Sequence, residues 1–198
     1  MPDPIREIHI FPLNTVLFPD GLLPLKVFEQ RYIEMTKACL RDRLPFGVCL
    51  IREGREVGTA AVPETVGCLA TIESWDMPQL GVFQLLARGT ARFRIREMRV
   101  APNHLISAGI EAIAADEPAP VDALCRKVLE AIIDKVGAER LPAPARLDDA
   151  AWVGFRLAEV LPIEPREKQA LLEMTDAAAR LVRLRGLLER QGLTADGA

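Results

Sequence analysis

The chain is poor in the side chains on which most enzyme mechanisms depend. Its 198 residues include two histidines, two serines and five lysines. Neither Ser74 nor Ser107 lies in a Gly-x-Ser-x-Gly turn, and no lysine follows a glycine as in a phosphate-binding loop. His9 alternates with Ile8 and Ile10, which favours an ordinary strand histidine over a base or a ligand. We therefore predict no catalytic residues, no cofactor and a protein that is not an enzyme.

Cysteine is also scarce, and its spacing excludes several kinds of site. The four cysteines are Cys39, Cys49, Cys68 and Cys125, so successive cysteines are 10, 19 and 57 positions apart. None of these intervals is the short pair that zinc ribbons or redox-active Cys-x-x-Cys motifs require. We expect the four thiols to be small buried apolar groups in a reducing cytoplasm, and we predict no metal site.

Long apolar runs and an excess of charge of one sign are both missing. Polar residues and prolines interrupt every early apolar run well before the roughly 20 residues of a membrane span. Lysine and arginine number 25 against 28 aspartates and glutamates, a net charge of −3. Hydrophobic residues make up 49% of the chain, enough to bury a sizeable core. We expect a cytoplasmic globular protein with no membrane partner and no strong attraction for nucleic acid.

Strand-like segments dominate the first part of the chain. Apolar runs and alternations predict strands over 7–11, 22–27, 46–51, 66–75, 81–87, 91–100 and 105–113. One stripe with helical spacing, formed by Phe28, Tyr32, Met35 and Cys39, predicts a helix over about 29–41 that packs on the sheet. Gly89 is interpreted as the turn of a hairpin between 82–88 and 91–99. This pattern favours a barrel or a curved mixed sheet.

Helical periodicity takes over after a segment rich in proline and alanine at 114–120. A helix over about 121–136 is followed by a second that Asp148 or Asp149 caps and Pro162 ends. Pro165 opens a third helix, and a last one ends near Gly192. The sequence therefore predicts a β-rich domain over 1–116 and a small helical bundle over 117–198.

Several motifs occur in an order that is typical of one protein family. The first is Phe11-Pro12-Leu13-Asn14-Thr15-Val16-Leu17-Phe18-Pro19, followed by Leu23-Pro24-Leu25 and Phe28-Glu29-x-Arg31-Tyr32. Segments 46–48, 66–70 and 89–93 continue the pattern, and the helical part contains Leu161-Pro162-Ile163-Glu164-Pro165. Together they resemble the amino-terminal, substrate-binding domain of Lon-type ATP-dependent proteases across nearly the whole chain.

The resemblance implies a fold of the α+β class. It is a PUA-like pseudo-β-barrel, a mixed sheet with one packed helix, followed by a small α-helical bundle. Complete Lon proteases add an ATPase and a Ser-Lys peptidase module, whose motifs are absent here, so the chain resembles the stand-alone single-domain bacterial members. The implied function is non-enzymatic recognition of unfolded or extended protein segments. A separate ATPase or protease is a candidate partner, and the oligomeric state stays open.

The candidate peptide-binding residues are apolar or charged side chains next to breaks in the pattern. Trp75, Met77 and Leu80 lie in a stretch that we interpret as a Pro-interrupted connection, where they could form an exposed contact site. The alternative is that Trp75 and Met77 pack onto the barrel. Glu29 and Arg31 follow a hydrophobic run and are interpreted as an ion pair or cap, or as ligand contacts.

A second class of function, RNA binding, depends on three arginines. The predicted alternation places Arg92, Arg94 and Arg96 on one face of a strand, with Phe93 and Ile95 on the other. This face could bind anions or RNA, since PUA-like barrels elsewhere hold RNA, or it could simply be solvated. The net acidic charge and the lack of interleaved aromatics weigh against nucleic acid. A hydrolase site inside the barrel is a third reading, which the scarcity of serine and histidine opposes.

Overall fold

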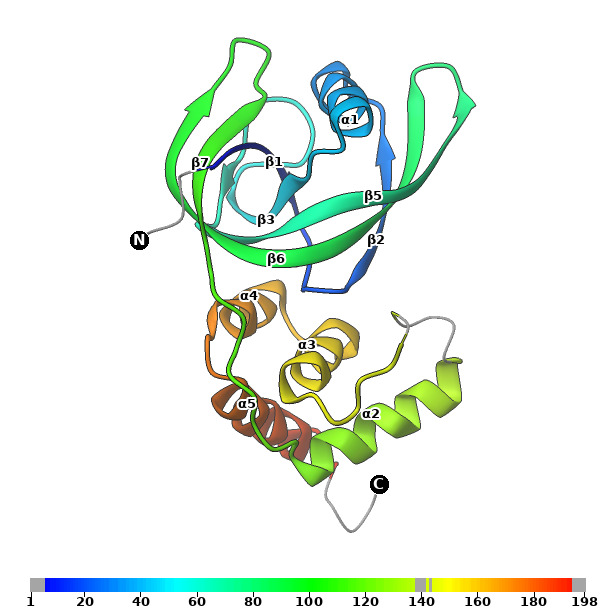
Figure 1. Ribbon diagram of the computed structural model, residues 1–198, viewed down its shortest axis with the longest axis vertical. Helices are drawn as coiled ribbons and strands as arrows, with labels where there is room; N and C mark the ends of the chain where they lie inside the picture. Colours follow the sequence, from blue (N-terminus) through cyan, green and yellow to red (C-terminus); the bar gives the residue numbers. More distant parts are fainter. Residues whose placement is uncertain (1–5, 138–141, 143, 194–198) are drawn as a thin grey trace. The chain divides into compact units, whose positions relative to one another are not determined.

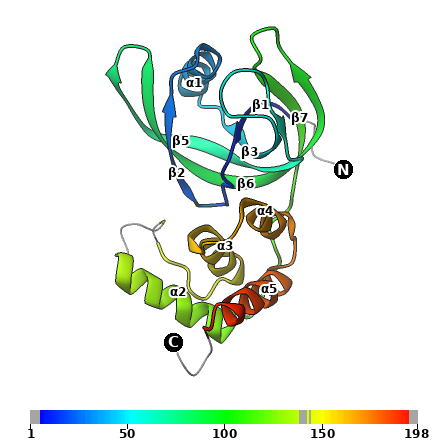
Figure 2. The same cartoon turned by 180° about the vertical axis from the view of Figure 1, so that it is seen from behind.

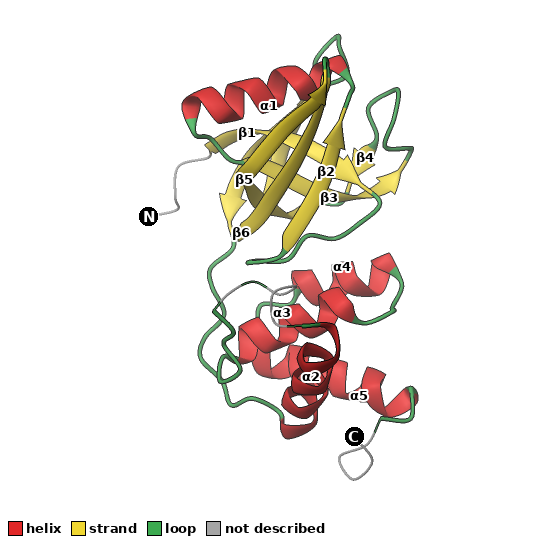
Figure 3. Cartoon of the chain, turned by 90° about the vertical axis from the view of Figure 1, so that its right-hand side faces the viewer, coloured by secondary structure: helices red, strands yellow, loops and turns green. Residues whose placement is uncertain are grey.

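The computed structural model describes residues 6–137, 142 and 144–193. The chain divides into two compact units, unit 1 at Met1–Ile113 and unit 2 at Ala114–Ala198 (Figure 1). The division falls three residues before the boundary that the sequence placed after Asp116. Figure 3 shows that strands and one helix build unit 1, whereas helices build unit 2. Among the described residues, no helix is both long and apolar enough to cross a membrane.

Unit 1 is a sheet that closes into a ring. Its elements are β1 (Arg6–Leu13), β2 (Leu22–Val27), α1 (Gln30–Asp42), β3 (Phe46–Glu53), β4 (Val62–Pro63), β5 (Val66–Gln79), β6 (Val82–Val100) and β7 (Ile106–Ala112). The strands pair in the order β1-β7-β6-β5-β3, and β3 returns to β1. The β1–β3 pair is parallel and the other pairs are antiparallel. This uneven ring is a PUA-like pseudo-barrel, and the predicted α+β fold is confirmed (Figures 1 and 2).

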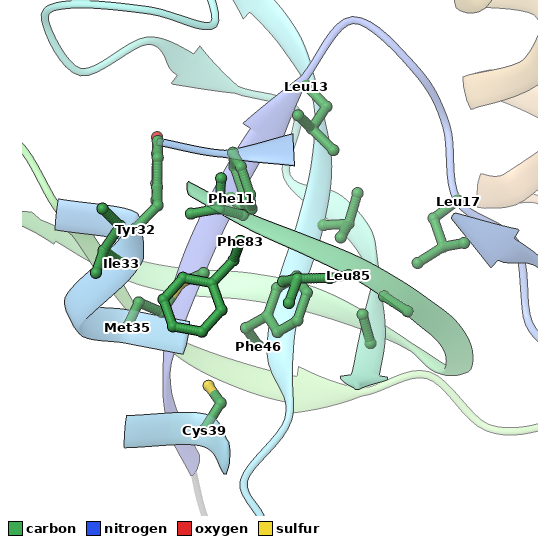
Figure 4. Packing of buried hydrophobic residues seen from close by; sticks show 14 of the residues in the cluster. Phe11, Leu13, Leu17, Tyr32, Ile33, Met35, Cys39, Phe46, Phe83 and Leu85 are labelled. Atoms are coloured by element: carbon green, nitrogen blue, oxygen red, sulfur yellow. The ribbon is translucent and has the colours of Figure 1, made fainter. Parts of the chain in front are cut away.

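Helix α1 closes the apolar core of unit 1. Its buried face, which includes Tyr32, Met35 and Cys39, joins a cluster with residues of β1, β3, β5 and β6 (Figure 4). The rings of Phe11 and Tyr32 stack with centroids 4.1 Å apart, and Phe46 lies 6.3 Å from Phe11. Aromatic side chains carry large apolar areas, so this contact ties the helix firmly to the sheet.

The predicted hairpin is at the wrong glycine. Strand β6 continues through Gly89, and the turn lies between β5 and β6 at Leu80 and Gly81, where Gly81 has a φ of 80°. The Gly89 N–H donates to the carbonyl of Gly21, and the Gly89 carbonyl accepts from the N–H of Asp20, both at 2.8 Å. Gly89 therefore allows two backbones to approach closely and does not reverse the chain.

Unit 2 contains the four predicted helices: α2 (Ala123–Val136), α3 (Ala150–Val160), α4 (Pro165–Glu173) and α5 (Ala177–Arg190). Aspartate side chains at 122, 149 and 176 accept hydrogen bonds from backbone N–H groups at three of the helix starts. Pro165 opens α4, where the preceding Glu164 makes no side-chain cap hydrogen bond. Carboxylate caps satisfy N–H groups that have no partner within the helix, which explains these boundaries.

All four cysteines are free and buried, as the sequence predicts. Burial raises the pKa of Cys39 to about 11 and that of Cys125 to about 12, and it also raises the pKa of Cys49. Because the thiolate is the reactive form, we expect a thiol reagent at mildly alkaline pH to label none of the four within minutes. Denaturant should expose all four. Rapid labelling of one thiol in the native protein would contradict this expectation.

Candidate functional site

Two hollows meet at strand β2 in unit 1. One, of about 370 Å³, is lined by Phe11, Leu13, Thr15, Leu23, Pro24, Leu25, Lys26, Val27, Phe28, Glu29, Tyr32, Glu56 and Val57. The other, of about 500 Å³, is lined by Pro24, Leu25, Lys26, Ser74, Trp75, Asp76, Gln84, Leu85 and Leu86. The hollows share the three residues 24–26, so they adjoin along β2, and their combined lining is a largely apolar surface. We call this surface the β2 groove.

Strand β2 has one unpaired edge. Among the described strands it pairs only with β6, from Leu22 opposite Arg88 to Val27 opposite Phe83. Figures 1 and 2 both show β2, in blue, beside the hairpin of β5 and β6. An unpaired edge presents backbone groups that an extended chain can use to add a strand. Pro24 and Lys26 are residues that discourage edge strands from pairing indiscriminately.

Large apolar side chains stand half-exposed at the rim of the β2 groove. The exposed fractions are 51% for Phe28, 56% for Val57 and 53% for Trp75. The Trp75 ring contacts Phe83, with centroids 5.7 Å apart, so its orientation is partly fixed. Exposed apolar groups gathered at a concave surface are typical of sites where proteins dock.

Sequence reasoning missed Phe28 and Val57 as rim residues. The helical spacing predicts Phe28 on the stripe of the helix, but α1 begins at Gln30 after the extended residue Glu29, so Phe28 lies outside the helix. Val57 lies between β3 and β4 in a segment without periodicity. In the sequence, Val57 is an isolated apolar residue among charged and small ones, and that pattern does not identify a binding residue.

The structure separates the three predicted apolar residues. Trp75 lines the β2 groove, whereas Met77 is partly buried against the core cluster and Leu80 is 93% exposed at the hairpin turn. The predicted Pro-interrupted connection is instead the end of β5, which pairs with β6. Pro78 falls where the register shifts between Asp76 and Gln79, a position at which a strand tolerates proline.

Glu29 and Arg31 form an ion pair at the start of α1. The Arg31 Nη2 lies 3.1 Å from Glu29 Oε2, its Nη1 donates to the His104 carbonyl at 3.0 Å, and its guanidinium lies 4.5 Å from the Tyr32 ring centroid. Burial raises the pKa of Tyr32 to about 12, and the Arg31 charge partly opposes this rise. Arg31 is committed to these contacts, while Glu29 also lines the β2 groove.

The three arginines of the alternative face do not share one exposed surface. Arg92 is only 3% exposed, Arg94 is half-buried, and Arg96 is paired with Glu111. The register with β7 shifts between Ile95 and Glu97, so a bulge at position 96 breaks the alternation on which the prediction rested. The expectation of a common solvent face is therefore wrong.

A contact that the sequence did not indicate joins His9 to Ser107. The His9 Nδ1 and Ser107 Oγ lie 3.0 Å apart because the two residues are direct partners in the β1–β7 pairing. In a hydrolytic triad the serine contacts Nε2 and a carboxylate contacts Nδ1–H, the reverse of the nitrogen used here. The contact is an ordinary cross-strand pair.

Comparison with known proteins assigns the fold to a family. A family model described as the ATP-dependent protease La (LON) substrate-binding domain matches residues 7–190. The chain belongs to this family. It is 32% identical over 201 residues to Lon protease 2 of Myxococcus xanthus, and 32% identical over 199 residues to the Lon protease of Anaeromyxobacter dehalogenans. These matches cover 94% and 93% of the chain but 24% and 23% of those relatives, so this Lon-type domain spans about a quarter of their length.

Two solved structures share this fold. The crystal structure of a Lon N-terminal domain protein from Xanthomonas campestris matches with a TM-score of 0.78 and 35% sequence identity, covering 92% of this chain and 98% of that one. The N-terminal domain of the Mycobacterium avium complex Lon protease shares the fold, with a TM-score of 0.67 at 19% identity. The Lon-type assignment therefore holds over the β-rich and helical parts alike.

Proposed function

We propose that this Lon-type domain recognises extended apolar segments of other proteins at the β2 groove. The observation that carries the proposal is the conjunction of an unpaired strand edge with half-exposed Phe28, Val57 and Trp75 beside it. The family description, a substrate-binding domain of an ATP-dependent protease, supports a protein chain as the occupant. An unfolded client exposes both free backbone groups and apolar side chains, and the groove is complementary to each.

Binding would combine two sources of affinity. The bound segment would pair its backbone with the outer edge of β2, as in β-strand addition, while alternate side chains enter the apolar hollows. Backbone pairing is independent of sequence, so it suits a domain that meets many clients. The side-chain pockets would then favour segments in which large apolar residues alternate with smaller ones.

We propose no reaction for the chain itself. Binding would hand a client to an ATPase or protease module, since the relatives that share this domain are named Lon proteases. The division of labour is physically reasonable, because recognition needs only exposed apolar area and a strand edge. Peptide cleavage would need an activated nucleophile in addition.

Removing the aromatic rim is expected to weaken binding without unfolding unit 1. The probe is a fluorescein-labelled peptide that alternates leucine with serine, and fluorescence anisotropy measures its dissociation constant. Phe28→Ala with Trp75→Ala should weaken binding by about 1–3 kcal/mol, the usual range for truncated interface anchors. Both side chains are half-exposed, so the melting temperature should change little.

The matched control is Val100→Ala, which removes an apolar side chain that is 50% exposed and lies outside both hollows. A second peptide carries proline at the serine positions. It should bind more weakly than the leucine–serine peptide if strand pairing contributes, because proline cannot donate a backbone hydrogen bond. Unchanged affinity in the Phe28 and Trp75 variant would contradict the proposed site. Salt-sensitive RNA binding that Arg94→Glu abolishes would instead support the alternative class.

A further inference from the structure

One wall of the β2 groove is a short segment between β3 and β4, residues 54–60, which we call the strap. Most of its residues are exposed, and its Val57 faces the same hollow as Phe28. At its base, Gly54 has a φ of 105° and lies close enough to Ala61 that a Cβ atom there would be 3.1 Å from the Ala61 Cα. The strap therefore leaves the sheet and returns at nearly one point.

Two carboxylates outside the regular strand pairing fasten the strap to its surroundings. Glu56, on the strap, accepts a hydrogen bond from the Asn14 N–H at 2.6 Å, just beyond β1. The Gly58 N–H donates to Glu29 Oε2 at 3.2 Å, at the start of α1. These contacts attach the strap to both sides of the hollow that it borders.

Glu29 is well suited to hold the strap because it is itself held. Arg31 donates to both Glu29 oxygens, and Arg31 is anchored by the His104 carbonyl and the Tyr32 ring. The Arg31 side chain is 4% exposed, so the pair is a fixed point of unit 1. The ion pair thus places an acceptor for the Gly58 N–H at the mouth of the groove.

We propose that the strap is a latch that closes over a protein segment bound in the β2 groove, with Glu29 and Glu56 as its positioning residues. The inference rests on the proposed function and specifies how that site retains its ligand. A segment held by few buried apolar contacts and by exposed hydrogen bonds opens locally at small cost in free energy. Opening the strap admits an extended chain, and closing it brings Val57 onto the apolar side chains of the ligand.

Gly58 offers a clean way to disturb the latch. Its φ is 99°, and no atom lies within 4 Å of an added Cβ, so Gly58→Ala strains the backbone without a steric clash. Gly192→Ala is the matched control, because Gly192 has a φ of 82° and the same open space, and it lies in unit 2. A second variant, Glu56→Ala, cuts the link to Asn14 without changing a glycine.

The experiment measures the dissociation rate of the leucine–serine peptide by stopped-flow anisotropy, and amide hydrogen exchange with and without the peptide. Gly58→Ala and Glu56→Ala should each raise the dissociation rate about 3- to 10-fold with little change in the association rate, as is usual within one interface. Gly192→Ala should change neither rate. In the unaltered protein, the peptide should slow amide exchange at Gly58 and Asn14.

Two results would overturn the latch. One is an unchanged dissociation rate in both strap variants while the Phe28 and Trp75 variant still binds weakly, which leaves the proposed function intact. The other is faster dissociation without any peptide-dependent slowing of exchange at Gly58 and Asn14, which shows that the strap does not close on the ligand. If the unaltered protein does not bind the peptide, the proposed function fails, and the latch fails with it.

Discussion

Arg180→Ala is expected to lower the free energy of unfolding of unit 2 by about 3–5 kcal/mol, the usual result of removing one partner of a buried ion pair. The side chains of Arg180 and Asp116 are both fully buried, and Arg180 Nη1 lies 2.5 Å from Asp116 Oδ2. Arg180 also donates to the carbonyls of Leu171 and Met174, and its guanidinium lies 4.1 Å from the Phe155 ring centroid. Alanine would leave a buried carboxylate and two carbonyls without this donor.

Tryptophan fluorescence during urea unfolding measures the effect. Trp152 is 2% exposed in α3 and reports on unit 2, provided that Trp75 is replaced by phenylalanine in every variant. The control is Arg183→Ala on the same helix, since the Arg183 pair with Glu167 is partly exposed and worth at most about 1 kcal/mol. Equal losses in the two variants would show that burial does not set the value of the Arg180 pair.

Gly89→Ala is expected to destabilise unit 1 by about 3 kcal/mol, the upper end of the range for overpacked positions. A Cβ atom at Gly89 would overlap the carbonyl oxygen of Phe18 and lie 3.2 Å from Cys68 Sγ. A backbone carbonyl cannot move aside as a flexible side chain can. The hydrogen bonds of Gly89 with Asp20 and Gly21 hold the two backbones in this close approach.

Circular dichroism at increasing urea concentration measures this loss, with Trp75 fluorescence as a reporter in unit 1 when Trp152 is replaced by phenylalanine in every variant. Gly186→Ala is the matched control, because Gly186 lies inside α5 and the nearest atom to its added Cβ is the flexible Arg190 Nη1 at 3.6 Å. That change should stabilise the protein by roughly 0.5–1 kcal/mol, the usual advantage of alanine over glycine in a helix. A Gly89 variant as stable as the unaltered protein would contradict the close approach.

The same glycine shows where prediction from the sequence stops. The periodicities predicted most elements of the pseudo-barrel and all four helices of unit 2, because apolar spacing is a local property of the chain. Gly89 has no local feature that separates a turn from a close approach, since the opposing Phe18 carbonyl lies some 70 residues earlier. The chain turns at Gly81 instead, a residue that the sequence pattern places at the start of the predicted strand over 81–87.

The candidate site was predictable only in part for a similar reason. Trp75 stood out as a large apolar residue in an irregular stretch, and the structure places it in the β2 groove. Phe28, just after β2, and Val57, in the strap, also line the groove. They come together only in the folded chain, so no spacing along the sequence indicates it. The prediction that Arg92 and Arg96 share one face of the strand is wrong, because a single bulge residue reverses which face the following side chains occupy.

The closed ring also has a consequence for synthesis on the ribosome. Strand β1 is made well before β7, yet the two strands pair, with Arg6 opposite Ile110. At about 5–20 residues per second, β7 follows β1 by roughly 5–20 seconds. During that interval the nascent β1 has an unpaired edge, to which a chaperone or a nascent chain from a neighbouring ribosome can bind. Translational pausing between the codons for β1 and β7 should therefore lengthen the time for which newly made unit 1 is prone to aggregate.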